Sequence, residues 1–152
     1  MFSSSDSSFM SLAIQEAEKA YALDEVPVGS VIVKNGNIIG VGFNQVISHH
    51  SVASHAEINA IVSASKVLNN YRLNECDIYV TLEPCHMCAK AIVDARIDNV
   101  YFAAFEPKTG SIVSIDNFFD KGFNNFYISV NFKSKLIKAY LEELKLEKKI
   151  KI

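Results

Sequence analysis

Two short motifs, distant from each other in the chain, constrain its fold more than any other feature. The first is His55-Ala56-Glu57 and the second is Pro84-Cys85-His86-Met87-Cys88. His55, Cys85 and Cys88 are ligands of the kind that zinc prefers, and three protein ligands leave one tetrahedral position open for a water. A structural zinc site would normally fill that position with another Cys or His. We therefore expect a fold that brings the two motifs together as a catalytic zinc site, with one Zn2+ ion per subunit.

Each motif alone is weak evidence. A Cys-x-x-Cys could be a redox pair or half of a structural zinc site, and a His-x-Glu is common by chance. The combination, with a proline before the first cysteine, is far more restrictive. Residues two apart in an α-helix point about 200° apart. His55 and Glu57 can therefore converge only if both lie in the first turn of a helix and the metal lies beyond its N-terminus.

The hydrophobic pattern predicts an alternation of helices and strands. Asn35-Gly36 between two runs rich in β-branched residues is a strong hairpin signal. This order of elements predicts a three-layer α/β/α fold with one mixed, five-stranded sheet. Because the two metal-binding helices each follow a strand, we expect their N-termini to meet at one edge of the sheet. The expected helices cover residues 8–23, 54–68, 86–95, part of 108–120, and 134–149, and the expected strands cover residues 28–33, 38–43, 78–82, 100–104 and 126–130.

Length and composition indicate how many domains the chain forms and in which compartment it works. The 152 residues are enough for one domain spanning 1–152, with the serine-rich segment 1–7 expected to be disordered. No apolar run is long enough to span a membrane, and the start of the chain is not typical of a signal peptide. With two of three cysteines assigned to metal, the chain fits a reducing compartment, which favours the cytoplasm. We interpret the third, Cys76, as a small buried hydrophobic residue.

His-x-Glu followed by Pro-Cys-x-x-Cys is the signature of zinc-dependent nucleobase deaminases, and the chain resembles that superfamily. Within it, the chain is most similar to the bacterial tRNA-specific adenosine deaminases. The resemblance covers almost the whole sequence and implies a cytidine-deaminase-like fold, conversion of adenosine to inosine at the wobble position, the tRNA anticodon stem-loop as partner, and a homodimer. The segments that carry it are Glu25-Val26-Pro27-Val28-Gly29, Gly40-Val41-Gly42-Phe43-Asn44, His55-Ala56-Glu57-Ile58, Asn70-Tyr71-Arg72-Leu73, Tyr79-Val80-Thr81-Leu82-Glu83-Pro84-Cys85 and Lys108-Thr109-Gly110.

Deamination needs an activated water and a group that carries its proton to the ring and then to the leaving amine. Glu57 is the candidate for that catalytic role. The resemblance also implies substrate contacts. Asn44 would hydrogen-bond the base, Pro27 and Val28 would form an apolar wall against its face, and the Ala56 N–H would bond the base carbonyl once it forms.

For RNA binding, the resemblance implies Glu106, Lys108 and Asn124. Glu106 replaces the aspartate that is usual in the family, and an aromatic and arginine-rich C-terminal helix is replaced by a lysine-rich one. Lysine neutralises phosphate but lacks the planar, stacking guanidinium of arginine. The basic residues between positions 133 and 151 either hold phosphates or form an ordinary solvated helix face.

Two other functions compete with this one. A deaminase of guanine, cytosine or a pyrimidine nucleotide would share the zinc motifs. Cytidine deaminases typically have Cys in place of His55, however, and guanine deaminases usually have Ser-Cys in place of Thr81-Leu82. A non-catalytic, zinc-stabilised binding module would need a fourth ligand, such as Cys76 or His86. The polar-loop residues His49 and His50 receive no role.

Overall fold

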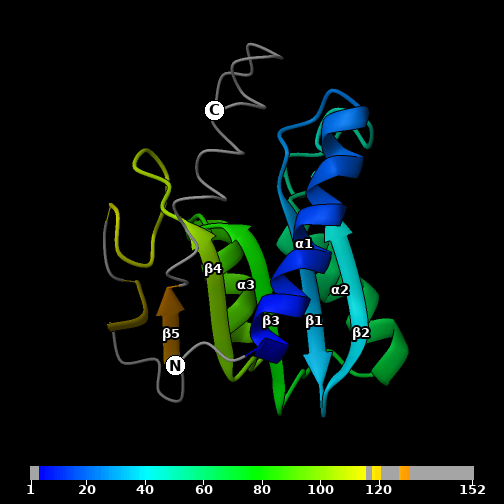
Figure 1. Cartoon of the computed structure of the whole chain (residues 1–152), viewed down its shortest axis with the longest axis vertical. Helices are drawn as coiled ribbons and strands as arrows, with labels where there is room; N and C mark the ends of the chain where they lie inside the picture. The colour runs from blue at the N-terminus through cyan, green and yellow to red at the C-terminus, as the bar shows by residue number, and fades with distance from the viewer. Residues whose placement is uncertain (1–3, 116–117, 121–126, 131–152) are drawn as a thin grey trace.

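A mixed β-sheet separates one helix from two others (Figure 1). The computed structural model describes residues 4–115, 118–120 and 127–130. The strands follow the spatial order β2-β1-β3-β4-β5. β1 is antiparallel to β2 and β3, whereas β3, β4 and β5 run parallel. The elements are α1 (Ser4–Ala22), β1 (Gly29–Lys34), β2 (Asn37–Phe43), α2 (Ala56–Leu68), β3 (Cys76–Leu82), α3 (His86–Asp94), β4 (Asn99–Ala104), the 3₁₀ turn η1 (Phe118–Asp120) and β5 (Tyr127–Val130).

The hairpin between β1 and β2 forms at the predicted Asn-Gly pair. Asn35 and Gly36 both have positive φ, 51° and 77°, and Lys34 pairs with Asn37 across the turn. Consecutive residues with positive φ match the twist of the adjoining strands, which is why Asn-Gly is favoured here. Because of the hairpin, β2 and β3 end on the same side of the sheet. The helices α2 and α3 begin beside these strand ends (Figure 1).

Close packing against β2 fixes the start of α2. A Cβ atom on Gly42 would lie 2.4 Å from the Ala56 carbonyl oxygen, and one on Gly40 would lie 2.6 Å from that of Ala60. The facing residues Ala56, Ala60 and Ala64 are all 0% exposed. Their spacing of four residues puts them on one side of the helix. Small residues on both surfaces thus hold the helix backbone directly against the strand.

The N-terminal helix begins earlier than the sequence pattern predicts. Residues 4–7, expected to be disordered, form the first turn of α1. The cause is a contact with β3: the Tyr79 hydroxyl donates a hydrogen bond to Asp6, which is only 9% exposed. The Tyr79 ring also stacks on Tyr101. A buried carboxylate with a partner so far along the chain anchors a segment whose composition suggests disorder.

The remaining predictions agree with the described structure. Strands and helices from residue 28 to residue 104 begin and end within two residues of their predicted bounds. The short helix expected within 108–120 is the 3₁₀ turn η1, and the helix expected at 134–149 lies outside the described residues. The three-layer α/β architecture with a mixed sheet is confirmed. Among the described residues, no helix is both long and apolar enough to cross a membrane.

Candidate active site

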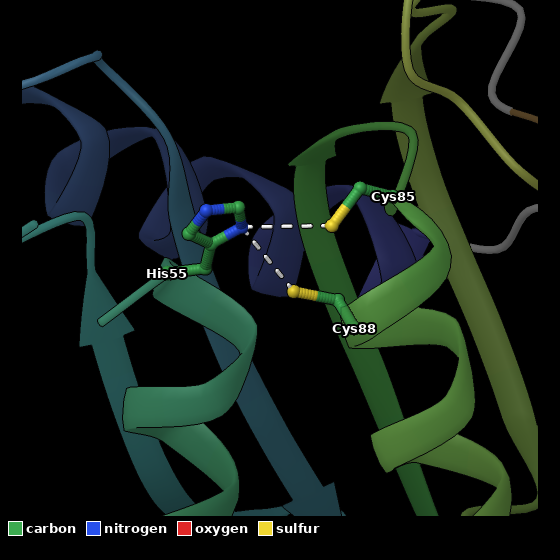
Figure 2. Close-up of side chains that lie close together, drawn as sticks. All are labelled: His55, Cys85 and Cys88. Carbon is green, nitrogen blue, oxygen red and sulfur yellow. Dashed lines mark hydrogen bonds between the residues drawn. The ribbon is translucent and has the colours of Figure 1, made fainter. Parts of the chain in front are cut away.

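The three predicted metal ligands meet where α2 and α3 begin. His55 is the N-cap residue of α2, Cys85 is the N-cap residue of α3, and Cys88 follows in the first turn of α3. Figure 2 shows the histidine ring directed at the two sulfur atoms, with Nδ1 3.6 Å from Cys85 Sγ and 3.5 Å from Cys88 Sγ. Tetrahedral zinc, with Zn–S of about 2.3 Å and Zn–N of about 2.0–2.1 Å, separates nitrogen and sulfur ligands by about 3.5 Å. The donor set and its spacing therefore fit zinc.

The two thiols of this group shift each other's pKa through a shared hydrogen bond. A hydrogen bond from the Cys88 thiol, aided by His55, lowers the pKa of Cys85 to about 4 against the opposing effect of burial. The same bond and burial raise the pKa of Cys88. Both residues lie at the positive end of α3, which favours thiolate. Thiolate is the form that coordinates zinc.

No further side chain among the described residues completes this group. His55, Cys85 and Cys88 lie with their ligand atoms within 4.8 Å of one another, and neither Cys76 nor His86 belongs to the cluster. Cys76 is 0% exposed, as predicted, and its thiol contacts the Asn74 carbonyl at 3.5 Å. A zinc site with three protein ligands keeps one position for water, which is the arrangement of catalytic rather than structural zinc.

Glu57 lies in the first turn of α2 and lines the same cavity as the metal-binding residues His55 and Cys85. It is 4% exposed, and burial is the main cause that raises its pKa above the ordinary carboxyl value. A raised pKa brings a carboxyl group closer to the pH at which it can both accept and donate protons. Glu57 is therefore suited to proton transfer and stands outside the group of metal ligands.

The cavity has a volume of about 540 Å³ and is lined by residues at or after the ends of β2, β3 and β4. Val28 and Asn44 line it, whereas the buried Pro27 does not contribute to its surface. Its remaining lining shows that segments 24–26, 46–47 and 82–83, together with Thr109, belong to the site. The lining residues are Asp24, Glu25, Val26, Val28, Asn44, Val46, Ile47, His55, Glu57, Leu82, Glu83, Cys85 and Thr109.

Asn44 and Ala56, both predicted to contact the base, are bonded to each other. The Ala56 N–H donates to Asn44 Oδ1 at 2.7 Å, and Asn44 is 8% exposed. This bond satisfies one of the free N–H groups at the start of α2. It also occupies one of the two acceptor positions of the Asn44 oxygen, while the amide N–H groups of Asn44 can donate to a base.

Two glutamates that the sequence analysis did not select hold the walls of the cavity. Glu25, 1% exposed, accepts the N–H groups of Ile47 and Ser48 at 2.9 and 2.8 Å, and the Ser48 hydroxyl at 2.8 Å. Burial alone would raise the pKa of Glu25, but these hydrogen bonds, aided by His49, outweigh it and lower the pKa. Glu83, 3% exposed, accepts hydrogen bonds from segment 106–114. The only hint of these buried glutamates in the sequence is their position next to apolar residues, in Glu25-Val26 and Leu82-Glu83.

Side-chain hydrogen bonds also hold the turn that precedes α2. His49 Nδ1 lies 2.9 Å from the Ser54 hydroxyl, which donates to Asn59 Oδ1 at 3.2 Å. The Asn59 amide donates to the Phe43 carbonyl at 2.8 Å. These bonds connect the end of β2 to the first turns of α2 on either side of His55. His49, which received no role from the sequence, thus supports the turn that presents this ligand.

The residues predicted to contact RNA lie in different environments. Lys108 is exposed, whereas Glu106 is 3% exposed, with Oε1 accepting the Lys108 N–H at 3.0 Å. Among the described residues, Oε2 of Glu106 has no hydrogen-bond partner. In this conformation Glu106 shapes its own loop. Asn124 lies outside the described residues.

Comparison with known proteins decides the family. Residues 3–104 match the family described as the cytidine and deoxycytidylate deaminase zinc-binding region. The tRNA-specific adenosine deaminase of Aquifex aeolicus is 39% identical over 142 residues, which cover 90% of this chain and 94% of that protein. The chain belongs to the tRNA-specific adenosine deaminase family. It is thus a member of a family of hydrolytic, zinc-binding deaminases, and zinc is the cofactor that the His55-Cys85-Cys88 group fits.

Solved structures support the same assignment for this deaminase. A structure from work on A-to-I editing by tRNA:A34 deaminases at the wobble position of transfer RNA is 38% identical, with a TM-score of 0.82. The match covers 91% of this deaminase and 99% of that chain. The guanine deaminase of Bacillus subtilis is 35% identical, with a TM-score of 0.64 and coverage of 78% and 71%. The deaminase thus resembles both classes, and the tRNA enzyme over a larger share of each chain.

Proposed function

We propose that this deaminase converts adenosine to inosine at the wobble position of tRNA anticodons. The observation that carries the proposal is the similarity to the tRNA:A34 deaminase structure over 99% of that chain. The anticodon stem-loop is the proposed partner. A base in a loop is cheaper to unstack and turn into a cavity than one in a duplex.

The overall reaction replaces the exocyclic amine of the base by oxygen, consuming water and releasing ammonia. His55, Cys85 and Cys88 would hold the zinc, which when bound would lower the pKa of a water toward about 7. Glu57 accepts a proton from this water and gives it to the ring nitrogen beside the attacked carbon. Glu57 would then take the remaining proton of the attacking oxygen and pass it to the departing amine, which leaves as ammonia while that oxygen becomes the carbonyl of the product. Its burial, raised pKa and position on the cavity wall support both transfers.

The substrate base would lie between apolar and polar surfaces of the cavity. Val28 supplies part of the apolar wall, with Pro27 packed behind it. Asn44 offers its amide N–H groups, because its oxygen accepts the Ala56 N–H. The Ala56 N–H, which donates to Asn44 here, would turn to the carbonyl of the product as it forms.

Lys108, Glu106 and Asn124 are the proposed RNA contacts. Lys108 is an exposed residue next to the cavity residue Thr109, and its positive charge can neutralise a phosphate near the bound base. Glu106 keeps a carboxylate oxygen without a partner among the described residues, and a ribose hydroxyl could donate to it after a small movement of the loop.

The proposal includes the organisation of the whole chain. We infer a single domain over 1–152, one zinc ion per subunit, a homodimer and a cytoplasmic location. The five-stranded, cytidine-deaminase-like sheet belongs to the same proposal. It is supported by the backbone pairing of β5 with β4.

The test is inosine formation in an arginine tRNA transcript with an ACG anticodon, using zinc-loaded protein. Guanine and cytidine serve as parallel substrates, with ammonia release as the readout. Inosine confined to the wobble position is expected. Ammonia from guanine or cytidine without inosine would replace the proposal by a small-molecule deaminase. Turnover of none of these substrates by zinc-loaded protein would favour the non-catalytic module.

A further inference from the structure

The side chain of Glu83 connects the metal-binding loop to a different wall of the cavity. Glu83 directly follows β3 and precedes the ligand Cys85 by two residues. Its carboxylate is enclosed by segment 106–114, which follows β4 and carries the cavity residue Thr109. One residue therefore touches both the segment that holds metal and the segment that faces substrate.

Five donors of that segment converge on the carboxylate. Oε2 accepts the N–H groups of Ile112, Val113 and Ser114 at 3.0, 2.9 and 3.0 Å. Oε1 accepts the N–H of Glu106 at 3.2 Å and also the Ser114 hydroxyl. Hydrogen bonds to an ionised acceptor are roughly twice as strong as neutral ones. The carboxylate thus takes the place of the regular backbone partners that this loop lacks.

The segment is moulded closely around Glu83. A Cβ atom on Gly110 would lie 2.4 Å from Cδ of Glu83 and 2.6 Å from the Glu106 carbonyl oxygen. The Pro84 carbonyl adds two contacts, accepting the N–H of Ser111 at 2.9 Å and its hydroxyl at 3.1 Å. A glycine is required here by space, since any side chain would collide with the carboxylate.

We propose that Glu83 is a positioning residue, which fixes segment 106–114 so that Thr109 and Lys108 meet the substrate while the base is in the cavity. The proposal rests on the proposed function and names how the same site places its RNA. All five donors come from the substrate-facing segment. The N–H of Glu83 itself donates to the Ala104 carbonyl at 2.9 Å, so that a side-chain substitution leaves this anchor of the metal-binding loop in place.

The experiment compares Glu83→Ala and Glu83→Gln with the wild-type enzyme on an anticodon stem-loop. For Glu83→Ala we expect KM to rise on the order of tenfold, because misplaced binding groups weaken productive binding. We expect kcat to change little and zinc content to stay at the wild-type level. Amide hydrogen exchange at Ile112, Val113 and Ser114 should accelerate. Glu83→Gln keeps one acceptor oxygen and should show the same pattern to a smaller degree.

Two further variants separate positioning from general destabilisation. Tyr79→Phe removes a buried hydrogen bond to Asp6 on the α1 face, outside the cavity lining, and should leave KM unchanged. Glu25→Gln should accelerate exchange at Ile47 and Ser48 but not at residues 112–114. If Glu83→Ala does not fold, Ser114→Ala removes one donor to the same carboxylate and should raise KM slightly.

An unchanged KM in Glu83→Ala, with residues 112–114 exchanging faster, would overturn the proposal. So would a parallel loss of zinc and kcat, because Glu83 would then support the metal site instead. If wild-type enzyme forms no inosine, the proposed function fails, while the exchange data still decide whether Glu83 holds the segment.

Discussion

The zinc-binding centre, which consists of His55, Cys85 and Cys88 with Glu57 beside them, and the walls of the cavity are held in place by different kinds of contact. The centre lies on the first turns of α2 and α3, and α2 is pressed against the sheet by contacts such as Gly42 with Ala56. The walls are loops, and buried carboxylates of Glu25 and Glu83 hold them by accepting backbone N–H groups.

Because of this difference, we expect the centre to determine the chemical step and the walls to determine how the substrate is placed. Helix hydrogen bonds and close packing fix the centre, so that it should tolerate changes in the loops. One carboxylate accepts several of the N–H groups of each loop, so that the position of the loop should be sensitive to substitution of that residue. Variants of the centre should therefore change zinc content or kcat, and variants of the walls should change KM or stability.

The largest effect is expected from Cys88→Ala. Loss of one of three ligands should reduce bound zinc from about one ion per chain to near zero and abolish inosine formation. Metal analysis and the inosine assay check this. Cys76→Ala is the matched control, since Cys76 is buried away from the metal-binding group and its variant should keep zinc. Full zinc occupancy in Cys88→Ala would exclude this residue as a ligand.

Glu57→Gln should separate metal binding from catalysis within the centre. Without a proton carrier, kcat should fall by about 10²–10⁴, while zinc content stays unchanged. Steady-state kinetics and metal analysis on the same preparation measure both. Glu18→Gln, at an exposed position of α1, is the control and should behave as wild type. Normal turnover in Glu57→Gln would remove Glu57 from the mechanism.

Asn44 lies at the boundary between centre and wall, and two substitutions distinguish its two contacts. Asn44→Ala leaves the Ala56 N–H without its acceptor, costing about 1–3 kcal/mol of stability, and removes the donor to the base. Its kcat/KM should fall roughly tenfold to a hundredfold. Asn44→Asp restores an acceptor for Ala56 but not the donor. Thermal unfolding should then recover while kcat/KM stays low, and recovery of both would contradict a direct contact with the base.

The smallest effect on turnover is expected at the other wall, where Glu25→Gln should mainly affect stability and its pH dependence. The pKa of Glu25 is lower in the folded protein than its ordinary value of 4.5. Its contribution is therefore present above that value and lost as pH falls through the lower, folded-state pKa. At about pH 7 the variant should be less stable by roughly 1–3 kcal/mol. Thermal unfolding at several pH values should show this difference shrinking in acid, and a constant difference would contradict it.

The sequence predicted the metal-binding group because the identity and spacing of its members are set by metal coordination. The motif formed by His55, Cys85 and Cys88 can be recognised in the sequence alone, before the surrounding structure is known. The hairpin was equally predictable, since Asn35 and Gly36 are favoured by the positive φ angles of the turn.

The features that the sequence did not reveal depend on contacts between distant segments. Glu25 and Glu83 bind backbone N–H groups, which every residue except proline carries, so the partner segment leaves no mark in the sequence. The first turn of α1 is fixed by Asp6 and Tyr79, 73 positions apart. The bond between Asn44 and Ala56 likewise became visible only once the loop after β2 was folded.

The way Glu83 binds its loop has an evolutionary consequence. A carboxylate that contacts a main-chain N–H group places few demands on the side chain of that residue, as at Val113, which is 48% exposed, whereas Ser114 also contributes its hydroxyl. The segment can therefore change sequence while it keeps its path, provided that Gly110 leaves room for the carboxylate. The same zinc-binding core could thus serve other substrates when the sequence of this one loop changes.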